Sequence, residues 1–191
     1  MSQRSPVDRQ RIAGFLNQLG RQCRCAGRLY LVGGSSVVFE NLRKLTLDID
    51  LTFEVDPGSE NRLVQAIREL KEELDVNVEQ VSPGDFIPLP AGYRDRSEFV
   101  GRFGELDVFH FDLYSTALSK IERGSEQDFA DVQMLLNANK IEWARLQGFF
   151  DEILPRMGEH SLRQDPVEFE QNFRALAAMR RDLPGSHGGG I

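Results

Sequence analysis

The spacing of apolar residues predicts both strands and helices up to about residue 111, and helices alone after it. From Asp8 to about Gln22 the apolar residues recur at helical spacing, which predicts an amphipathic helix. RLYLV then reads as a short buried strand, and the apolar residues after GGSS predict a helix that starts just after the glycines. In LTLDIDLTFEV the two classes alternate, which predicts a strand with one apolar and one polar face.

The same reasoning extends to the rest of the chain. A helix is expected over 61–74, and strands over VNVEQV, SEFVGRF and ELDVFHF, the last two joined at Gly104 by a hairpin turn. Helices are expected over 113–123, 126–137, 143–157 and 167–183. This order predicts an α+β fold, a mixed sheet flanked by helices with a C-terminal helical part. We expect an α/β core over 1–111, a helical part of the same domain over 112–183, and a disordered tail over 184–191.

Composition adds limits on compartment and partners. The 191 residues carry a net charge of -7, and no stretch approaches the roughly 20 apolar residues that span a bilayer. The first residues show no apolar signal-peptide core, so we expect a cytoplasmic protein without a membrane partner. Cys23 and Cys25 are expected to be unpaired thiols near a helix end. The acidic net charge means that any nucleic acid would have to meet a local basic surface.

Asp48 and Asp50 are the strongest candidates for chemistry. They lie two apart on a predicted strand, so their carboxylates project from one face with Cα atoms about 6.5 to 7 Å apart. Aspartate is depleted in strands, and two such charges repel unless a cation lies between them. Mg²⁺ and Mn²⁺ suit this arrangement, because they bind through one or two carboxylates and substrate phosphates. A solvated polar face of an edge strand is the other interpretation.

The turn Gly33-Gly34-Ser35-Ser36 is the second candidate. It joins a predicted strand to a predicted helix, where small residues let the backbone approach a ligand and helix N–H groups face an anion. It matches neither the P-loop spacing nor G-x-G-x-x-G, and a plain tight turn is the competing reading. The order strand, GGSS, helix, strand with D-x-D is more specific than either part.

LVGGSSVVF followed by RKLTLDIDLTF resembles the Gly-Ser and Asp-x-Asp signature of the DNA polymerase β-like nucleotidyltransferase superfamily. Within it, ALSKIERGSEQDFADVQMLL resembles the AbiEii-type nucleotidyltransferases of bacterial toxin–antitoxin systems and their uncharacterised relatives. The likeness covers roughly residues 28 to 136. It implies a nucleotidyltransferase fold and an enzyme that uses a nucleoside triphosphate with Mg²⁺ or Mn²⁺.

The resemblance also implies roles for particular residues. Gly34 and Ser35 would hold the triphosphate, and Asp48 and Asp50 would bind metal. Lys120, with Asp128 or Asp131, would belong to the catalytic residues. The superfamily adds a third carboxylate from a neighbouring strand, a place that Asp107 fits in Leu106-Asp107-Val108, although it shares its predicted face with Phe109 and Phe111.

Several of these residues have structural readings too. Asp128 follows Ser125 at the spacing of a capping box, and Asp131 lies one turn later. Lys120 lies on a largely apolar helix, where a lysine can extend its ammonium group to the surface. Asp112 lies where a helix begins and reads as an N-cap.

Two other features complete the candidates. The Pro- and Gly-rich segment from Ser82 to Arg96 is too long for a simple turn and is a candidate functional loop, in which Arg94 and Arg96 could contact nucleic acid or simply face solvent. His110 has no partner at metal-ligand spacing and is expected to be structural or exposed.

The leading hypothesis is a nucleotidyltransferase that moves a nucleoside monophosphate from an NTP to a macromolecular acceptor. The resemblance suggests a tRNA or a protein as acceptor, and a cognate antitoxin or toxin as a partner. The other hypothesis is a non-catalytic nucleotide-binding or partner-binding module that retains the fold.

Overall fold

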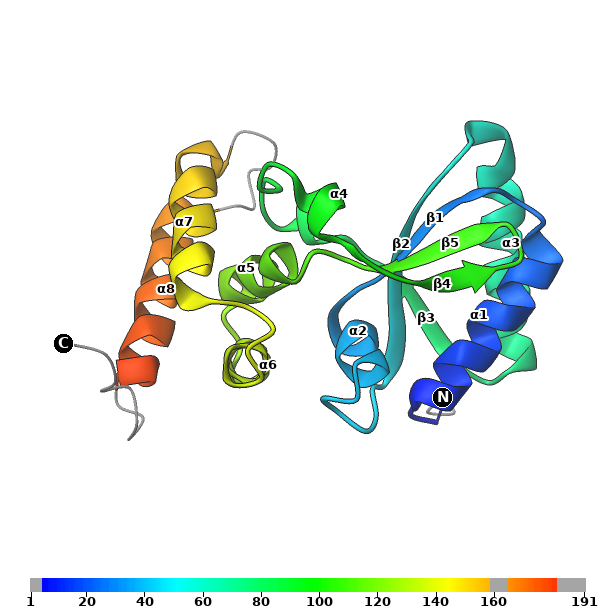
Figure 1. The fold of residues 1–191 in the computed structure, drawn as a ribbon, viewed down its shortest axis with the longest axis horizontal. Coiled ribbons are helices and arrows are strands. Elements are labelled where there is room, and N and C mark those ends of the chain that lie inside the picture. Colours follow the sequence, from blue (N-terminus) through cyan, green and yellow to red (C-terminus); the bar gives the residue numbers. More distant parts are fainter. Residues whose placement is uncertain (1–4, 159–164, 182–191) are drawn as a thin grey trace. The chain divides into compact units, whose positions relative to one another are not determined.

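The computed structural model describes residues 5–158 and 165–181, and contains a five-stranded mixed sheet (Figure 1). The strands are β1 (Gly27–Leu31), β2 (Asp48–Val55), β3 (Asn77–Gln80), β4 (Glu98–Phe103) and β5 (Leu106–His110), in the order β3-β2-β1-β5-β4. The predicted fold class, a mixed sheet flanked by helices with a C-terminal helical part, is confirmed. No helix in the described part of the chain combines the length and apolarity needed to cross a bilayer.

The chain divides into two compact units, which we describe separately. The first comprises 1–82 and 94–112 and holds the sheet; the second comprises 83–93 and 113–191 and is helical. The segment 83–93 therefore lies apart in sequence from the helices with which it packs. The tail expected over 184–191 lies outside the described residues.

In the first unit, α1 (Arg9–Cys23) and α3 (Pro57–Glu73) pack on the apolar face of the sheet. β1 runs antiparallel to β2 and parallel to β5, which places its apolar residues in the middle of the core. Ile49 and Leu51 of β2 are fully buried on that face, whereas Asp48 and Asp50 are only partly buried. The period of two thus assigned both faces correctly within β2, whereas Leu45 and Leu47, which precede the strand, are 50% and 63% exposed.

Two helix starts differ from the prediction. α2 (Gly33–Phe39) begins at the first glycine of GGSS instead of after it. α3 begins at Pro57, four residues before the expected Asn61, because Pro57 occupies the first helical turn, where its missing N–H costs nothing. The glycines of the candidate turn are therefore part of the helix itself.

The second unit contains four longer helices: α5 (Leu113–Arg123), α6 (Glu126–Asn137), α7 (Trp143–Ile153) and α8 (Pro166–Arg181). The helix expected over 143–157 ends early, and a 3-10 turn, η2 (Leu154–Arg156), follows, because Pro155 has no N–H to continue the α-helical pattern. Phe150 stacks on Phe173 at a ring separation of 4.0 Å and contacts Phe169, which closes the core between α7 and α8.

The candidate loop from Ser82 to Arg96 is ordered by local structure. It contains a 3-10 turn, η1 (Pro83–Asp85), and a short helix, α4 (Tyr93–Arg96). The Ala91 N–H donates to Glu152 Oε1 at 2.8 Å, and Arg156 donates to the Leu89 carbonyl at 3.4 Å. These bonds attach the 83–93 segment to the helices of the second unit.

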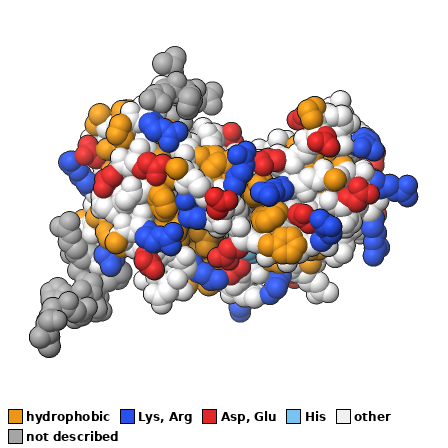
Figure 2. Space-filling view, turned by 45° about the horizontal axis from the view of Figure 1, so that its top comes forward, with side chains coloured by type: hydrophobic (Ala, Val, Ile, Leu, Met, Phe, Trp, Pro, Cys, Tyr) orange, Lys and Arg blue, Asp and Glu red, His pale blue; other side chains and the backbone are white. Residues whose placement is uncertain are grey.

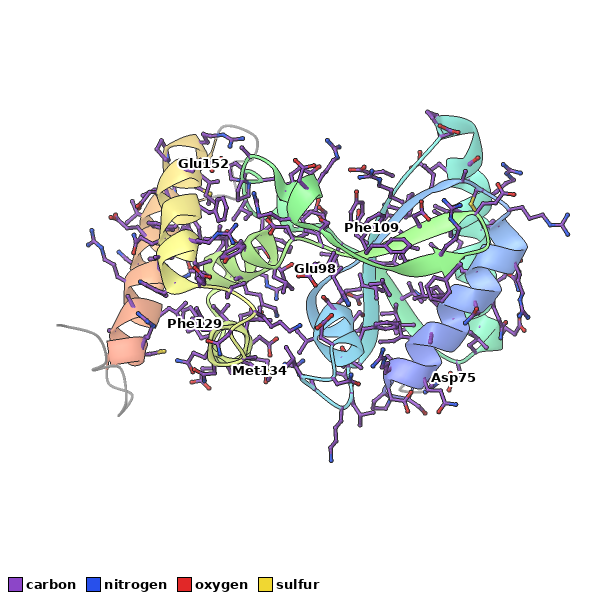
Figure 3. All side chains as sticks on the ribbon, viewed as in Figure 1. Asp75, Glu98, Phe109, Phe129, Met134 and Glu152 are labelled. Atoms are coloured by element: carbon purple, nitrogen blue, oxygen red, sulfur yellow. A yellow bond between two sulfur atoms is a disulfide. The ribbon has the colours of Figure 1, made fainter. Side chains whose placement is uncertain are left out.

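The expectation of two unpaired thiols was wrong. Cys23 and Cys25 are joined by a disulfide, with a Cα–Cα distance of 5.3 Å, where α1 ends (Figure 3). Both side chains are 2% exposed. The single residue between them, Arg24, turns the chain through a left-handed conformation that brings the two cysteines together.

Candidate functional site

Asp48 and Asp50 stand at the start of β2, on the sheet face away from α1 and α3. Asp48 is aligned with Asn77 of β3, whose side-chain amide donates to Asp48 Oδ1 at 2.5 Å. On the other side, the Val32 N–H donates to the Asp50 carbonyl at 3.0 Å, which joins the end of β1 to the start of β2. The GGSS turn, which follows Val32 directly, therefore begins beside the two carboxylates.

Ser35 fixes this turn to the aspartate strand. Its hydroxyl accepts a hydrogen bond from the Asp50 N–H at 2.7 Å and donates to the Asp48 carbonyl at 3.2 Å. The side chain is fully buried, so these two bonds satisfy a hydroxyl that has no access to water. Ser35 thus sets the spacing between the turn and the aspartate pair.

Space limits both glycines of the turn, and backbone conformation also limits Gly33. Gly33 has φ of 53°, and a Cβ atom there would lie 2.9 Å from Asp50 Oδ2. A Cβ atom on Gly34 would lie 2.5 Å from Thr46 Oγ1. Any larger residue would push against the carboxylate or against the Thr46 side chain, so the close approach of turn and carboxylate depends on glycine.

The donors at this point suit a hard divalent cation. Two carboxylates on one strand face provide the one or two protein ligands that Mg²⁺ takes when phosphates supply the rest. Within the described residues, no group of three His, Cys, Asp or Glu side chains is arranged to hold a metal ion. The residues present therefore fit a metal shared with a phosphate substrate.

Asp107, the predicted third carboxylate, is not brought to this pair. It is aligned with Arg28 of β1, which is aligned with Glu54 of β2, whereas Asp50 lies beside Val32. Glu54, at the level of Asp107, is four residues along β2 from Asp50, which corresponds to about 13 Å. Both carboxylate oxygens of Asp107 also accept hydrogen bonds from Arg102, at 2.7 and 2.9 Å. These bonds are the main cause that lowers the pKa of Asp107, and the charges of Arg102 and Arg28 add to it.

The arginines of the long loop are engaged within the first unit. Arg96 donates to both oxygens of Asp112, at 3.0 and 2.8 Å, and Asp112 is 1% exposed. Asp112, which the sequence suggests as an N-cap, is therefore held by a bidentate ion pair. Arg94 donates twice to Glu54 Oε1, at 3.1 and 2.9 Å. Both guanidinium groups are thus paired with a carboxylate, and the Arg94 side chain is also 56% exposed.

Sequence reasoning missed a buried polar chain beside the GGSS turn. Ser36 Oγ lies 2.9 Å from His110 Nδ1, and His110 Nε2 lies 2.9 Å from Glu40 Oε1. Ser36 and His110 are 1% and 5% exposed, and both His110 nitrogens are engaged. His110 thus ties the middle and the C-cap of α2 to the end of β5, while Ser35 ties α2 to β2. His110 lies far along the chain from Ser36 and Glu40, and a serine following Ser35 gave no separate signal.

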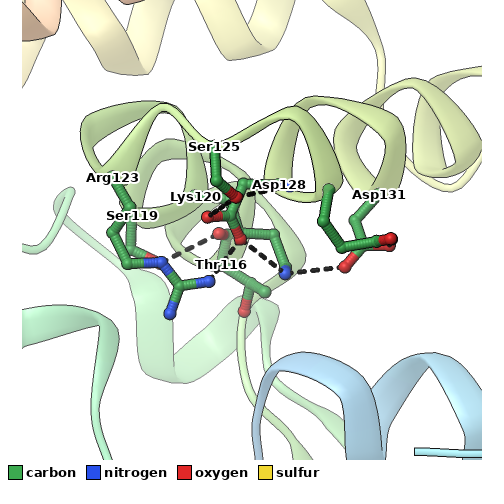
Figure 4. A network of polar contacts seen from close by, with 8 residues as sticks. Thr116, Ser119, Lys120, Arg123, Ser125, Asp128 and Asp131 are labelled. Atoms are coloured by element: carbon green, nitrogen blue, oxygen red, sulfur yellow. Dashed lines mark hydrogen bonds and ion pairs between the residues drawn. The ribbon is translucent and has the colours of Figure 1, made fainter.

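The second unit contains the remaining predicted residues, in one buried ion network (Figure 4). Lys120 Nζ lies 3.2 Å from Asp128 Oδ1 and 2.8 Å from Asp131 Oδ2. Arg123 also pairs with Asp128. Lys120 is 5% exposed, so it does not extend its ammonium group to the surface as one sequence reading suggested. The structure places Lys120, Asp128 and Asp131 in direct contact.

Asp128 combines a capping role with this network. Ser125 Oγ accepts from the Asp128 N–H at 3.1 Å and donates to Asp128 Oδ2 at 2.7 Å, so Ser125 is the N-cap of α6. Burial by itself raises the pKa of Asp128. Hydrogen bonds from Arg123 and Ser125, with the charge of Lys120, outweigh burial, and the pKa lies below its ordinary value. Asp128 is therefore held as a carboxylate.

The predicted site residues thus form two groups, one in each unit. Gly34, Ser35, Asp48 and Asp50 lie together in the first, and Lys120, Asp128 and Asp131 in the second. Neither a curated protein nor a solved structure matches the chain. Residues 11–174 match the family DUF6036, which is described as a nucleotidyltransferase of unknown function. That match spans both groups of predicted residues and most of the chain, and the chain therefore belongs to this nucleotidyltransferase family.

Proposed function

We propose that this protein is a metal-dependent nucleotidyltransferase that transfers a nucleoside monophosphate from an NTP to a macromolecular acceptor. The observation that carries the proposal is the double hydrogen bond of Ser35 to Asp48 and Asp50, which fixes a glycine turn against a pair of carboxylates. The match to a family described as a nucleotidyltransferase of unknown function supports nucleotidyl transfer as the reaction class. The arrangement offers oxygen ligands and close backbone approach at one place.

In this proposal Asp48 and Asp50 hold the divalent metal, Mg²⁺ or Mn²⁺, which would offset charge on the triphosphate oxygens. At Gly33 the backbone lies so close to Asp50 that a Cβ atom would be 2.9 Å from Asp50 Oδ2, so glycine keeps the turn against the carboxylates that would hold the metal. An acceptor hydroxyl oxygen bonds to the α-phosphorus, the bond from that phosphorus to the bridging oxygen breaks, and pyrophosphate leaves. The hydroxyl proton passes to a base or to water. Asn77 orients Asp48 through its amide.

Lys120, Asp128 and Asp131 enter the proposal through the likeness to AbiEii-type enzymes. Their mutual contacts support a fixed constellation in the second unit. The likeness alone gives Lys120 a role toward triphosphate or acceptor. A tRNA and a protein are the two acceptor classes, and a toxin or antitoxin partner follows from the same likeness. The alternative is a non-catalytic module, which the pairing of the Lys120 ammonium with two carboxylates favours.

The test is transfer of label. We expect purified protein with Mg²⁺, each of the four α-labelled NTPs and a whole-cell extract to label one discrete macromolecule. Asp48→Asn should abolish the label, and Asp107→Asn, which lies at the other end of the same sheet face, is the matched control that should retain it. Label sensitive to ribonuclease would identify an RNA acceptor, and label sensitive to protease a polypeptide. Absence of transfer despite metal-dependent NTP binding would favour the non-catalytic module.

A further inference from the structure

A second feature of the first unit is an open surface hollow between the end of α1 and the start of α3, whose polar lining residues are exposed. Its volume is about 670 Å³, and three arginines, three amides and one carboxylate provide its polar lining: Arg21, Arg24, Arg62, Gln22, Asn61, Gln65 and Glu69. The helices run antiparallel here, since Arg11 at the start of α1 donates to the Leu74 carbonyl at the end of α3. The hollow thus belongs to the opposite end of the helix pair.

This hollow is separate from the aspartate pair. α1 ends just before β1 and α3 starts just after β2, where Gly27 is aligned with Val55. Asp48 begins β2, so the hollow lies roughly 20 Å along the strand from it. A ligand held there would not share the proposed metal.

The charge of the lining differs from that of the whole protein. Three guanidinium groups and one carboxylate leave two positive charges at the hollow, although the chain carries -7. Glu69 is engaged by Gln65, whose side-chain amide donates to Glu69 Oε1 at 2.7 Å. Arg62 contacts only a neutral group among the described residues, the Ser59 hydroxyl at 3.0 Å. The side chains of Arg21 and Arg24 have no hydrogen-bond or ion-pair partner in the part of the chain that the structure describes.

The backbone at Arg24 is the independent observation. Arg24 caps α1 in the left-handed conformation, with φ of 46° and ψ of 45°. Glycine or asparagine normally takes this position, because a longer side chain there brings Cβ close to the following carbonyl. The disulfide between Cys23 and Cys25 encloses this residue and holds the turn. Arg24, at this turn, lines the hollow together with Arg21.

Stabilisation of the helix end does not account for all three arginines. Arg21 lies in the last turn of α1 and Arg24 is its C-cap, where a cation offsets the negative end of the helix dipole. That effect fades within a turn and gives no reason for Arg62, which lies on α3 and lines the same hollow. Guanidinium forks and amide N–H groups together match the oxygens of a phosphate.

We propose that Arg21, Arg24 and Arg62 form a binding site for a phosphate-bearing anion, distinct from the Asp48/Asp50 site. The ligand chemistry is a run of phosphate oxygens, supplied either by a free polyphosphate or by a nucleic-acid backbone. The proposal does not depend on nucleotidyl transfer, and binding requires no divalent metal.

The test is calorimetric titration of the full chain with tripolyphosphate, in EDTA and at low salt. We expect saturable binding of one anion, weakened about tenfold for each arginine replaced in Arg21→Gln, Arg24→Gln and Arg62→Gln. Arg68→Gln, an exposed arginine of α3 that does not line the hollow, is the matched control and should bind normally. The double variant Asp48→Asn with Asp50→Asn should also bind normally, which separates this site from the proposed function.

A second arm uses single-stranded oligonucleotides of increasing length. Affinity that rises with length identifies a nucleic-acid backbone as the source, and affinity no greater than that of tripolyphosphate identifies a free anion; either result supports the site. Arg24→Gly should raise the melting temperature, because glycine accepts the left-handed conformation, while it weakens binding. Equal anion affinity in the triple variant and in the wild type would overturn the proposal. So would Arg24→Gly that melts at lower temperature with affinity unchanged.

Discussion

At the scale of single residues, the candidate site depends on side chains that hold other groups in place. Ser35 is fully buried, and its hydroxyl hydrogen-bonds the backbone of Asp48 and Asp50. From the sequence we could predict that this serine belongs to the site, because it lies in a strand-to-helix turn. Its bonding to the aspartate strand could not be predicted, because that depends on how α2 folds back over β2.

Ser35→Ala is expected to lower both stability and nucleotide affinity. The Asp50 N–H loses its 2.7 Å partner in a buried place, which costs about 1–3 kcal/mol. The turn also loses its attachment to the carboxylates, so metal-dependent NTP binding should weaken. Chemical denaturation and calorimetry measure the two effects. Ser59→Ala, which removes an exposed bond to Arg62, should change neither; an unchanged NTP affinity in Ser35→Ala would disprove the positioning role.

Lys120→Met tests whether the network of the second unit is structural. The change leaves Asp128 and Asp131 buried without their shared ammonium group, so we expect a loss of about 3–5 kcal/mol in unfolding free energy. Urea unfolding of this variant, beside Lys140→Met at a surface position as the control, measures it. A stable Lys120→Met protein would show that these contacts contribute little to the fold, and activity lost in it would then report on chemistry directly.

The same network predicts an acid dependence. Because the pKa of Asp128 is lowered in the folded protein, the stability that it adds is present above the unfolded value of about 3.9 and is lost as the pH falls through the folded pKa. Wild type should therefore lose more stability between pH 5 and 2 than Asp128→Asn. Unfolding free energy measured against pH tests this. An equal loss in the two proteins over that range would contradict a lowered pKa for Asp128.

At the scale of elements, close packing of backbone on backbone sets the position of α1. A Cβ atom on Gly20 would lie 2.2 Å from the Phe103 carbonyl oxygen, and one on Gly104 would lie 2.3 Å from the Gly20 carbonyl oxygen. The hairpin at Gly104 was predicted from sequence. Its contact with α1 was not, because a glycine inside a helix pattern does not show which distant segment approaches it.

Two substitutions in α1 separate this contact from helix propensity. Gly14→Ala meets nothing within 4 Å and should stabilise the protein by about 0.5–1 kcal/mol. Gly20→Ala gains the same propensity but collides with the β4–β5 turn, so it should destabilise, by about 1–3 kcal/mol. Thermal melting of the pair gives the sign of each effect. Equal stabilisation by both substitutions would mean that α1 does not pack against the β4–β5 hairpin at Gly20.

At the scale of the whole molecule, the sequence predicted the elements better than their grouping. The helices over 113–123 and 126–137 and the alternation in β2 agree with the structure, because their periods are long and regular. The placement of 83–93 with the helical unit was missed, since its bonds to α7 and η2 join residues about 60 positions apart. Charge at the surface is mixed, with acidic and basic side chains interspersed on the face in Figure 2.

The central claim is that Asp48 and Asp50 bind a divalent metal that is needed for NTP binding. The most direct measurement is calorimetric titration of NTP with Mg²⁺ and in EDTA, in a background with Arg21, Arg24 and Arg62 changed to glutamine so that no second anion site contributes. We predict tight NTP binding with Mg²⁺ and no NTP binding in EDTA. The double variant Asp48→Asn with Asp50→Asn should bind NTP in neither condition. Its melting temperature should be equal or slightly higher, because like-charge repulsion is relieved. Equal NTP affinity in Mg²⁺ and in EDTA, or unfolding of the double variant at a markedly lower temperature, would contradict the account.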